Sequence, residues 1–122
     1  MTIRDELDSL NADFSRAYSA GDVEAVVGAY TEDARILFGG QPIVRGRVAI
    51  RALFSDAFKS GSEATTFETG EILAEGGLVI DVGRFVTPAG SGKYVVVYER
   101  GSDGRLRIAV DAASGDGPRP AG

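Results

Sequence analysis

The stretch "AYSAGDVEAVVGAYTEDARI", residues 17–36, carries the features that decide the fold. Gly21 follows an apolar pattern with a 3.6-residue period, and glycine is typical of a helix end because it adopts the left-handed conformation without strain. Asp22 comes directly afterwards and can cap a second helix. The predicted buried stripe of that second helix is Val23, Val26, Val27 and Tyr30. The stretch therefore predicts two helices that are separated by a sharp stop.

The first of these two helices begins near the N-terminus, and a third helix follows the stretch. Thr2 and Asp5 have the spacing of a capping box, so they predict a first helix that ends at Gly21. Gly46 begins a third helix, which ends near 60–61. The apolar stripe of the first helix is Ile3, Leu7, Leu10, Phe14, Ala17 and Tyr18, and that of the third is Ile50, Leu53, Phe54, Ala57 and Phe58.

The rest of the chain has the two-residue period of strands. One strand is expected at 34–38, and four more near 64–74, 78–87, 93–100 and 105–114. The turns "EGG", "PAGSG" and "GSDG" between the last four are short and rich in glycine, which favours antiparallel hairpins. Helices first and a meander of strands afterwards predict an α+β fold, in which a curved sheet wraps around a helix as a cone with a cavity at its open end.

Length and charge limit the classes of function. A chain of 122 residues fits one domain, which we expect to span 1–114, with a disordered tail over 115–122. The net charge of −5 disfavours nucleic acid as a partner, and the cluster of Arg45, Arg47 and Arg51 is interpreted as a solvated face. The absence of histidine and cysteine removes the usual zinc ligands. No cofactor, no metal and no membrane association are expected, and a cytoplasmic location is expected by default.

The sequence resembles a known superfamily. "AYSAGDVEAVVGAYTEDARI", "VRGRVAIRALF" and "DGRLRIAVDAAS" are similar to segments of the nuclear transport factor 2-like (NTF2-like) superfamily, in its SnoaL-like, ketosteroid-isomerase-like branch. The resemblance covers roughly residues 3–114. It implies a cone of three N-terminal helices packed on a curved, mostly antiparallel sheet. This fold hosts isomerases, cyclases, dehydratases and association domains, so it does not fix the function.

The resemblance also gives a test for steroid isomerase chemistry. A ketosteroid isomerase needs a tyrosine on the first helix, an aspartate base on the first strand and a protonated aspartic acid on a late strand. The matching positions here are Phe14, Phe38 and Val96. A hydrocarbon side chain cannot take a proton or donate a hydrogen bond, so this activity is not expected.

Strand alternation and the resemblance together predict the residues that face the cavity. One face of each late strand is expected to point inward: Val79, Asp81, Gly83, Phe85 and Thr87; Tyr94, Val96 and Tyr98; and Arg107, Ala109, Asp111 and Ala113. The residues expected to contact a ligand are Phe14, Tyr18, Phe38, Phe54, Phe58, Phe85, Tyr94 and Tyr98. The simpler interpretation is that the phenylalanines at helical spacing only form the core.

Asp81 and Asp111 are the candidate catalytic residues, because each interrupts a strand that is otherwise apolar. A carboxylate among apolar walls has a raised pKa and can serve as a general acid or base, with Tyr94 or Tyr98 as hydrogen-bond donor. Isomerisation, aldol cyclisation and dehydration fit these groups. Epoxide hydrolysis fits less well, because alternation places Arg84 on the opposite face from Asp81. A structural salt bridge with Arg84 or Arg107 is the alternative.

Two classes of function remain open at this point. One is a metal-free isomerase, lyase or cyclase that acts on a small, largely apolar molecule. The other is a non-catalytic ligand-binding or association module. A homodimer is expected in either case, because three helices can cover only one face of the sheet and the other face carries Val95 and Val97 or their neighbours.

Overall fold

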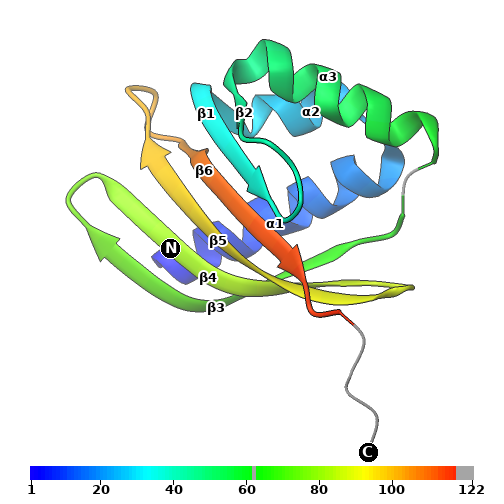
Figure 1. Ribbon diagram of the computed structural model, residues 1–122. Coiled ribbons are helices and arrows are strands. Elements are labelled where there is room, and N and C mark those ends of the chain that lie inside the picture. Colours follow the sequence, from blue (N-terminus) through cyan, green and yellow to red (C-terminus); the bar gives the residue numbers. More distant parts are fainter. Residues whose placement is uncertain (62, 118–122) are drawn as a thin grey trace, which may run out of the picture.

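The computed structural model describes residues 1–61 and 63–117. In these residues the helices lie on one face of a curved sheet (Figure 1). The α+β class expected from the sequence is confirmed, with a sheet of six strands in these residues. The elements are α1 (Ile3–Ala20), α2 (Val23–Gly28), β1 (Tyr30–Phe38), β2 (Val44–Arg45), α3 (Gly46–Lys59), β3 (Thr66–Glu75), β4 (Leu78–Thr87), β5 (Gly90–Arg100) and β6 (Leu106–Gly115).

The boundaries of the first two helices follow the expected signals. The Thr2 hydroxyl accepts a hydrogen bond from the Asp5 amide, and the Asp5 carboxylate accepts one from the Thr2 amide, which completes the capping box. Gly21 has a φ of 67°, the left-handed conformation that ends α1. The Asp22 side chain accepts from the Ala25 amide and begins α2. The chain therefore turns back on itself within two residues.

Tyr30 differs from its expected place. It begins β1 and does not belong to the stripe of α2, because α2 ends at Gly28 after six residues. The backbone explains the change. The Ala29 carbonyl accepts from the Ile108 amide, and Tyr30 pairs with Ile108 in a parallel register. Arg47 donates two hydrogen bonds to the Tyr30 carbonyl, at 2.6 and 3.0 Å. Arg47 therefore holds the start of β1 and is not only a solvated side chain.

The sheet has the strand order β2-β1-β6-β5-β4-β3. β1 pairs with β6 in parallel, and the other neighbours are antiparallel, so the sheet is mostly antiparallel as expected. α1 packs on β3 at one end of the sheet, and α3 packs on β1 towards the other end. All three helices lie over the same face of the curved sheet, which encloses the interior of the cone (Figure 1).

An irregularity in β6 changes which of its residues face the interior. Val97 pairs with Val110, but the next residue, Tyr98, pairs with Ile108, so β6 has one extra residue at this point. Such a bulge reverses the alternation on its two sides. The expectation that Arg107 shares the inner face with Asp111 and Ala113 is therefore wrong, and Ala109 is the extra, buried residue of the bulge. Ile108 takes the inner position opposite Tyr98, and Arg107 instead pairs with Asp103, at 2.7 Å.

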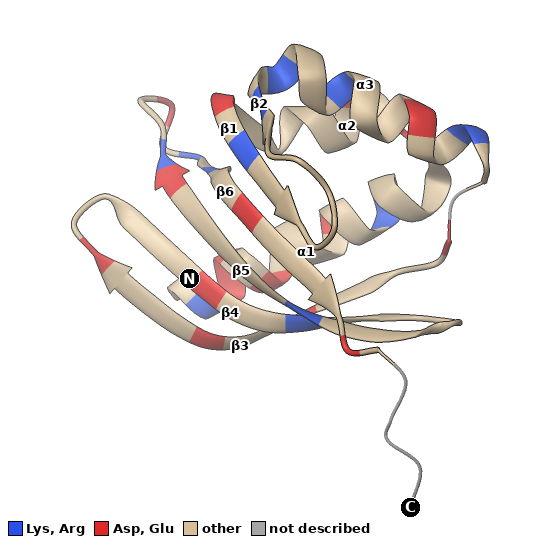
Figure 2. Cartoon of the chain, in the orientation of Figure 1, with Lys and Arg blue, Asp and Glu red and all other residues tan. Residues whose placement is uncertain are grey.

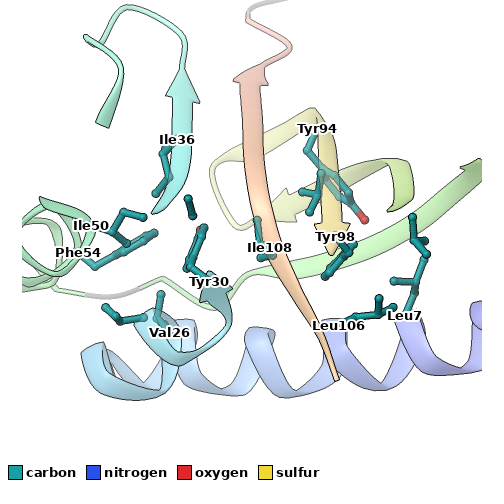
Figure 3. Close-up of a cluster of buried hydrophobic side chains, with 14 residues drawn as sticks. Leu7, Val26, Tyr30, Ile36, Ile50, Phe54, Tyr94, Tyr98, Leu106 and Ile108 are labelled. Carbon is teal, nitrogen blue, oxygen red and sulfur yellow. The ribbon is translucent and has the colours of Figure 1, made fainter. Parts of the chain in front are cut away.

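The core fills the interior between the helices and the sheet. Figure 3 shows side chains from α1, α2, α3 and the strands converging on one cluster, with Ile108 of β6 near its centre. Leu7, Val26, Tyr30 and Ile50 have no exposed surface. The full burial of Tyr30 brings a phenol hydroxyl into this apolar interior, where it needs a hydrogen-bond partner.

The outer face of the sheet is apolar at its centre and has no helix over it. Val82 pairs with Val95, and Val95 pairs with Ala112, which in turn pairs with Leu37. Val95 and Leu37 keep 41% and 39% of their surface exposed. These four residues form what we call the outer apolar stripe, which crosses β4, β5, β6 and β1.

In the view of Figure 2, basic and acidic residues are interspersed along the helices and strands. Arg51, from the cluster read as a solvated face, pairs with Glu24 at 2.8 Å, and Arg100 pairs with Glu6 at 3.0 Å. None of the helices in the described residues is long and apolar enough to cross a membrane.

The C-terminal boundary differs slightly from the expected one. β6 continues to Gly115, one residue beyond the expected end of the domain. Asp116 then donates its amide to the Ser91 carbonyl and accepts from the Ser91 hydroxyl at 2.7 Å. The first part of the expected tail is therefore held against β5, and residues 118–122 of that tail lie outside the described residues.

Candidate functional site

A cavity of about 340 Å³ lies between the helices and the inner face of the sheet. This volume is within the range of small-molecule sites, about 300–1,000 Å³. The cavity is lined by three of the expected aromatic residues from the helices, Phe14, Tyr18 and Phe54. The strands contribute Phe38, Phe85, Tyr94 and Tyr98. Seven of the eight residues expected to contact a ligand therefore line one space.

Phe58 is the expected ligand residue that does not line the cavity. Its ring packs instead against Tyr18 and Phe54, with ring centroids 5.2 and 5.9 Å apart. Phe58 therefore supports two lining rings from behind. Since α3 presents both Phe54 and Phe58 on one stripe, the helical period alone could not separate a ring that lines the cavity from one that supports it.

Several lining residues were not among the expected ones. Phe67 of β3 stands edge-on to Phe14, with centroids 5.2 Å apart, and Asn11 lines the same space from α1. Glu63 also lines the cavity and contributes to a raised pKa of Tyr18, whose main cause is burial. The sequence pattern predicted correctly that Tyr30 is buried. It did not predict which residue the Tyr30 hydroxyl would hydrogen-bond to.

The partner of Tyr30 is Asp111. The Tyr30 hydroxyl donates to Asp111 Oδ2 at 2.6 Å, and both residues line the cavity. Asp111 retains 8% of its surface. Burial raises the pKa of Asp111 to about 6, although the hydrogen bond from Tyr30 acts in the opposite direction by stabilising the ionised form. Burial and the carboxylate together raise the pKa of Tyr30 well above its usual range, so the phenol remains the proton donor of this pair.

The other oxygen of Asp111 is open. Within residues 1–61 and 63–117, no group donates a hydrogen bond to Oδ1, and this atom is not sealed from solvent. The Asp111 side chain thus faces the cavity beside Tyr94 and Tyr98, as expected, but neither tyrosine hydrogen-bonds to it. Neither Arg84 nor Arg107 is paired with it in the described residues.

Asp81 lies behind the cavity wall. It is fully buried, and it is absent from the residues that line the cavity. Its Oδ2 accepts hydrogen bonds from the Tyr94 hydroxyl at 2.9 Å and from the Thr69 hydroxyl at 3.0 Å. Asn11 in turn donates to Thr69 at 2.8 Å. Asp81 therefore contacts the cavity through Tyr94, whose position it fixes.

Gly83 makes room for this arrangement. A Cβ atom at Gly83 would lie 2.5 Å from the Tyr94 hydroxyl and 2.3 Å from the Glu68 carbonyl. A side chain larger than hydrogen would thus displace the Tyr94 ring from its place over β4. The sequence predicted Gly83 on the inner face as a residue that leaves room in the cavity. In the structure, the space beside Gly83 is occupied by the ring of Tyr94.

Tyr98 has a hydroxyl that is not committed to another side chain in the described part of the chain. Burial raises its pKa, and the carboxylates of Asp81 and Asp111 raise it further. The phenol therefore keeps its proton and can donate a hydrogen bond to a ligand. The Tyr94 hydroxyl, by contrast, donates its hydrogen bond to Asp81 and can only accept a hydrogen bond from a ligand.

The three positions that an isomerase would use all lie on this cavity. Phe14, Phe38 and Val96 are lining residues, so the apolar replacements are at the site and not beside it. Within the described residues, no three acidic side chains gather closely enough to hold a metal ion. The polar groups on the cavity are therefore phenols, hydroxyls, an amide and two carboxylates.

Comparison with known proteins decides the family. The profile of the SnoaL-like domain matches residues 12–109. The chain belongs to the SnoaL-like domain family. This family places it in the NTF2-like superfamily, as expected from the sequence. No curated protein matches the sequence.

Solved structures of similar fold come from several bacteria. A ketosteroid isomerase-like protein from Erwinia carotovora atroseptica has a TM-score of 0.81 at 14% identity, covering 94% of this chain and 97% of that one. An NTF2-like protein with a cystatin-like fold from Novosphingobium aromaticivorans has a TM-score of 0.77 at 21% identity, covering 94% and 83%. A protein from Catenulispora acidiphila in complex with S-DNPA has a TM-score of 0.78 at 19% identity, covering 93% of both chains. At these identities the likeness is one of fold.

Proposed function

We propose that this SnoaL-like protein binds a small, largely apolar molecule in the cone-shaped cavity, with Asp111 as the ionisable group that contacts it. The observation that carries the proposal is the open Oδ1 of Asp111 in an aromatic cavity of about 340 Å³. Buried carboxylates without a charged partner are rare, because removing a charge from water is costly. A ligand that contacts Oδ1 would offset that cost. The complex of the Catenulispora protein with S-DNPA supports small-molecule binding by this fold.

The proposal is tested by filling the cavity. Ala113 lies on the inner face of β6 and lines the cavity, so Ala113→Leu would occupy ligand space. Ala49→Leu, on the exposed side of α3, is the matched control. Binding of a fluorescent apolar probe and of a panel of bicyclic aromatic compounds is measured for the three proteins. We expect binding by the wild type and the control but weaker binding by Ala113→Leu. Equal binding by all three proteins would exclude the cavity as the site.

Proton transfer is a second candidate activity, and the pKa of Asp111 favours it. A pKa of about 6 is close to the working range of a general base, and the Tyr98 hydroxyl can donate to a carbonyl oxygen of the same substrate. Asp111 would take a proton from the carbon next to that carbonyl and return it to another atom. This step is common to isomerisation, aldol cyclisation and dehydration. Asp81 would support it indirectly, as the residue that positions Tyr94.

The second candidate has its own measurement. In deuterium oxide, an enolisable bicyclic ketone should exchange the protons next to its carbonyl faster with the wild type than without protein. Asp111→Asn should abolish the acceleration, since the amide cannot accept the proton. Exchange that is equally fast with Asp111→Asn would remove Asp111 from this role, whatever the result of the binding test.

An association function remains as the alternative to both. The outer apolar stripe has no cover within the described chain, and Val95 at its centre is 41% exposed. A second copy packed on this stripe would remove it from water. We therefore infer a homodimer, which leaves the cavity of each protomer on the opposite face of its sheet.

A further inference from the structure

The charge of the cavity lining is one-sided. Asp111 and Glu63 line it, and the described lining residues include no lysine or arginine. All four tyrosines of the chain and five of its six phenylalanines are also lining residues. The cavity is therefore aromatic and negatively charged, which is an unusual environment for a neutral hydrocarbon ligand alone.

The aromatic rings are arranged around one another so that several present faces or edges to the same space. Tyr18 is edge-on to Phe54 and to Phe67, with centroids 6.2 and 6.1 Å apart. Phe67 is also edge-on to Tyr94 at 6.4 Å. The face of an aromatic ring carries partial negative charge and attracts cations within about 6 Å of its centre.

We propose that the ligand of this cavity is an apolar molecule that carries one protonated amine, with its ammonium group held between the open Oδ1 of Asp111 and the faces of the surrounding aromatic rings. The inference rests on the proposed function, because it narrows the class of molecule that the cavity binds. An ammonium donates hydrogen bonds to the oxygen that lacks a partner, and its charge balances that of the carboxylate.

Other charge types fit the lining less well. An anionic ligand would bring a second negative charge next to Asp111 in a site with no described cationic side chain, and like charges that are poorly solvated repel strongly. A neutral alcohol can donate one hydrogen bond to Oδ1 but leaves the charge of the carboxylate uncompensated. With an amine bound, Asp111 is a counter-ion and the site is one of binding rather than proton transfer.

The groups that face Asp111 do not supply an internal counter-ion. β1 presents the hydroxyl of Tyr30 to Asp111, and Tyr98 of β5 and Tyr18 of α1 line the same cavity; all three are neutral phenols with raised pKa values. Asp81 of β4 adds a further carboxylate that acts on Tyr98. The α3 residue that lines the cavity is an aromatic ring. The ionised form of Asp111 is therefore free to pair with a cation from outside.

The test compares three molecules with one skeleton: naphthylmethylamine, naphthylmethanol and naphthoate. Their affinities for the purified full chain are measured by isothermal titration calorimetry at neutral pH. We expect the amine to bind at least about tenfold more tightly than the alcohol, as a desolvated ion pair with ring contacts allows, and the carboxylate to bind most weakly. Asp111→Asn should remove most of this preference while leaving the affinity for the alcohol nearly unchanged. Asp56→Asn removes the same charge from an exposed position on α3 and should keep the preference.

The pH dependence gives a second measure that does not depend on a variant folding well. Because protonation of Asp111 removes the counter-ion, the affinity of the wild type for the amine should fall about tenfold per pH unit below pH 6, while the alcohol shows no such fall. Equal affinities for the amine and the alcohol, or tighter binding of the alcohol, would overturn the inference but leave the proposed binding function intact. Failure of all three molecules and of the probe panel to bind would overturn both.

Discussion

Replacing Asp111 with asparagine should make the protein more stable at neutral pH and leave its stability almost unchanged in acid. Asparagine has nearly the same shape, and its amide oxygen can still accept the hydrogen bond from Tyr30. What the substitution removes is the ionisation of a side chain that retains only 8% of its surface. The difference between the two proteins therefore reports the free energy of ionising this one residue in the folded state.

The magnitude follows from the pKa. Burial raises the pKa of Asp111 from 3.8 to about 6, a shift of about two units, and each unit corresponds to about 1.4 kcal/mol, so the effect is about 3 kcal/mol. Below pH 3.8 the side chain is neutral in both the folded and the unfolded chain. As the pH rises from there to about 6, the unfolded chain ionises first, and the wild type loses stability. Above pH 6 the loss is complete.

The assay is urea unfolding of the wild type and Asp111→Asn at several pH values from 4 to 8, at one protein concentration. Other carboxylates, such as Asp103 with its pKa lowered to about 2 by Arg107, titrate alike in both proteins and cancel in the difference. Tyr30→Phe is a useful companion, because losing the hydrogen bond should raise the pKa of Asp111 and move its transition to higher pH. A stability difference that does not change with pH would refute the account of a desolvated carboxylate.

Three further predictions concern other parts of the molecule. Tyr94→Phe removes one of the two hydrogen bonds to the buried Asp81 and should lower the free energy of unfolding by about 1–3 kcal/mol, measured by chemical denaturation; unchanged stability would contradict the network. The purified protein should not turn over a standard ketosteroid, because its three isomerase positions are apolar; rapid turnover that is free of contaminating isomerase would show that another group acts. Light scattering should give a dimer, twice the monomer mass of 12.7 kDa, for the wild type and for the control Val48→Glu on α3. Val95→Glu, which places a charge in the outer apolar stripe, should give a monomer, and a monomeric wild type would exclude the dimer.

The sequence predicted the architecture because most of its signals are local. The capping pair, the left-handed Gly21 and the short hairpin turns each act within a few residues, and the structure has all of them. The parallel pairing of β1 with β6 joins residues far apart in the sequence, such as Tyr30 and Ile108, and it was not predicted, because no local signal marks it. Tyr30 shows the limit of periodicity, since burial was correct but the element was not.

The positions of the candidate residues were predictable, but the hydrogen bonds between them were less so. Alternation placed Asp81 and Asp111 on the inner face, and both are buried there. It failed at Arg107, because a single extra residue in β6 reverses the alternation and no local signal in "RLRIAV" marks that bulge. The hydrogen bond from Tyr30 to Asp111 depends on the register in which β1 pairs with β6. This register is a property of the folded sheet and cannot be derived from either strand alone.

Asp81 and Asp111 occupy equivalent positions in the alternating pattern, yet the structure gives them different surroundings. Two hydroxyl groups reach the same oxygen of Asp81, and its side chain is wholly enclosed. One hydroxyl reaches Asp111, and its second oxygen faces an aromatic cavity. A carboxylate enclosed by the protein can only hold its neighbours in place, whereas one that is open to a cavity can meet a molecule from outside. The division of roles between positioning and ligand contact therefore follows from which oxygen atoms the fold leaves accessible.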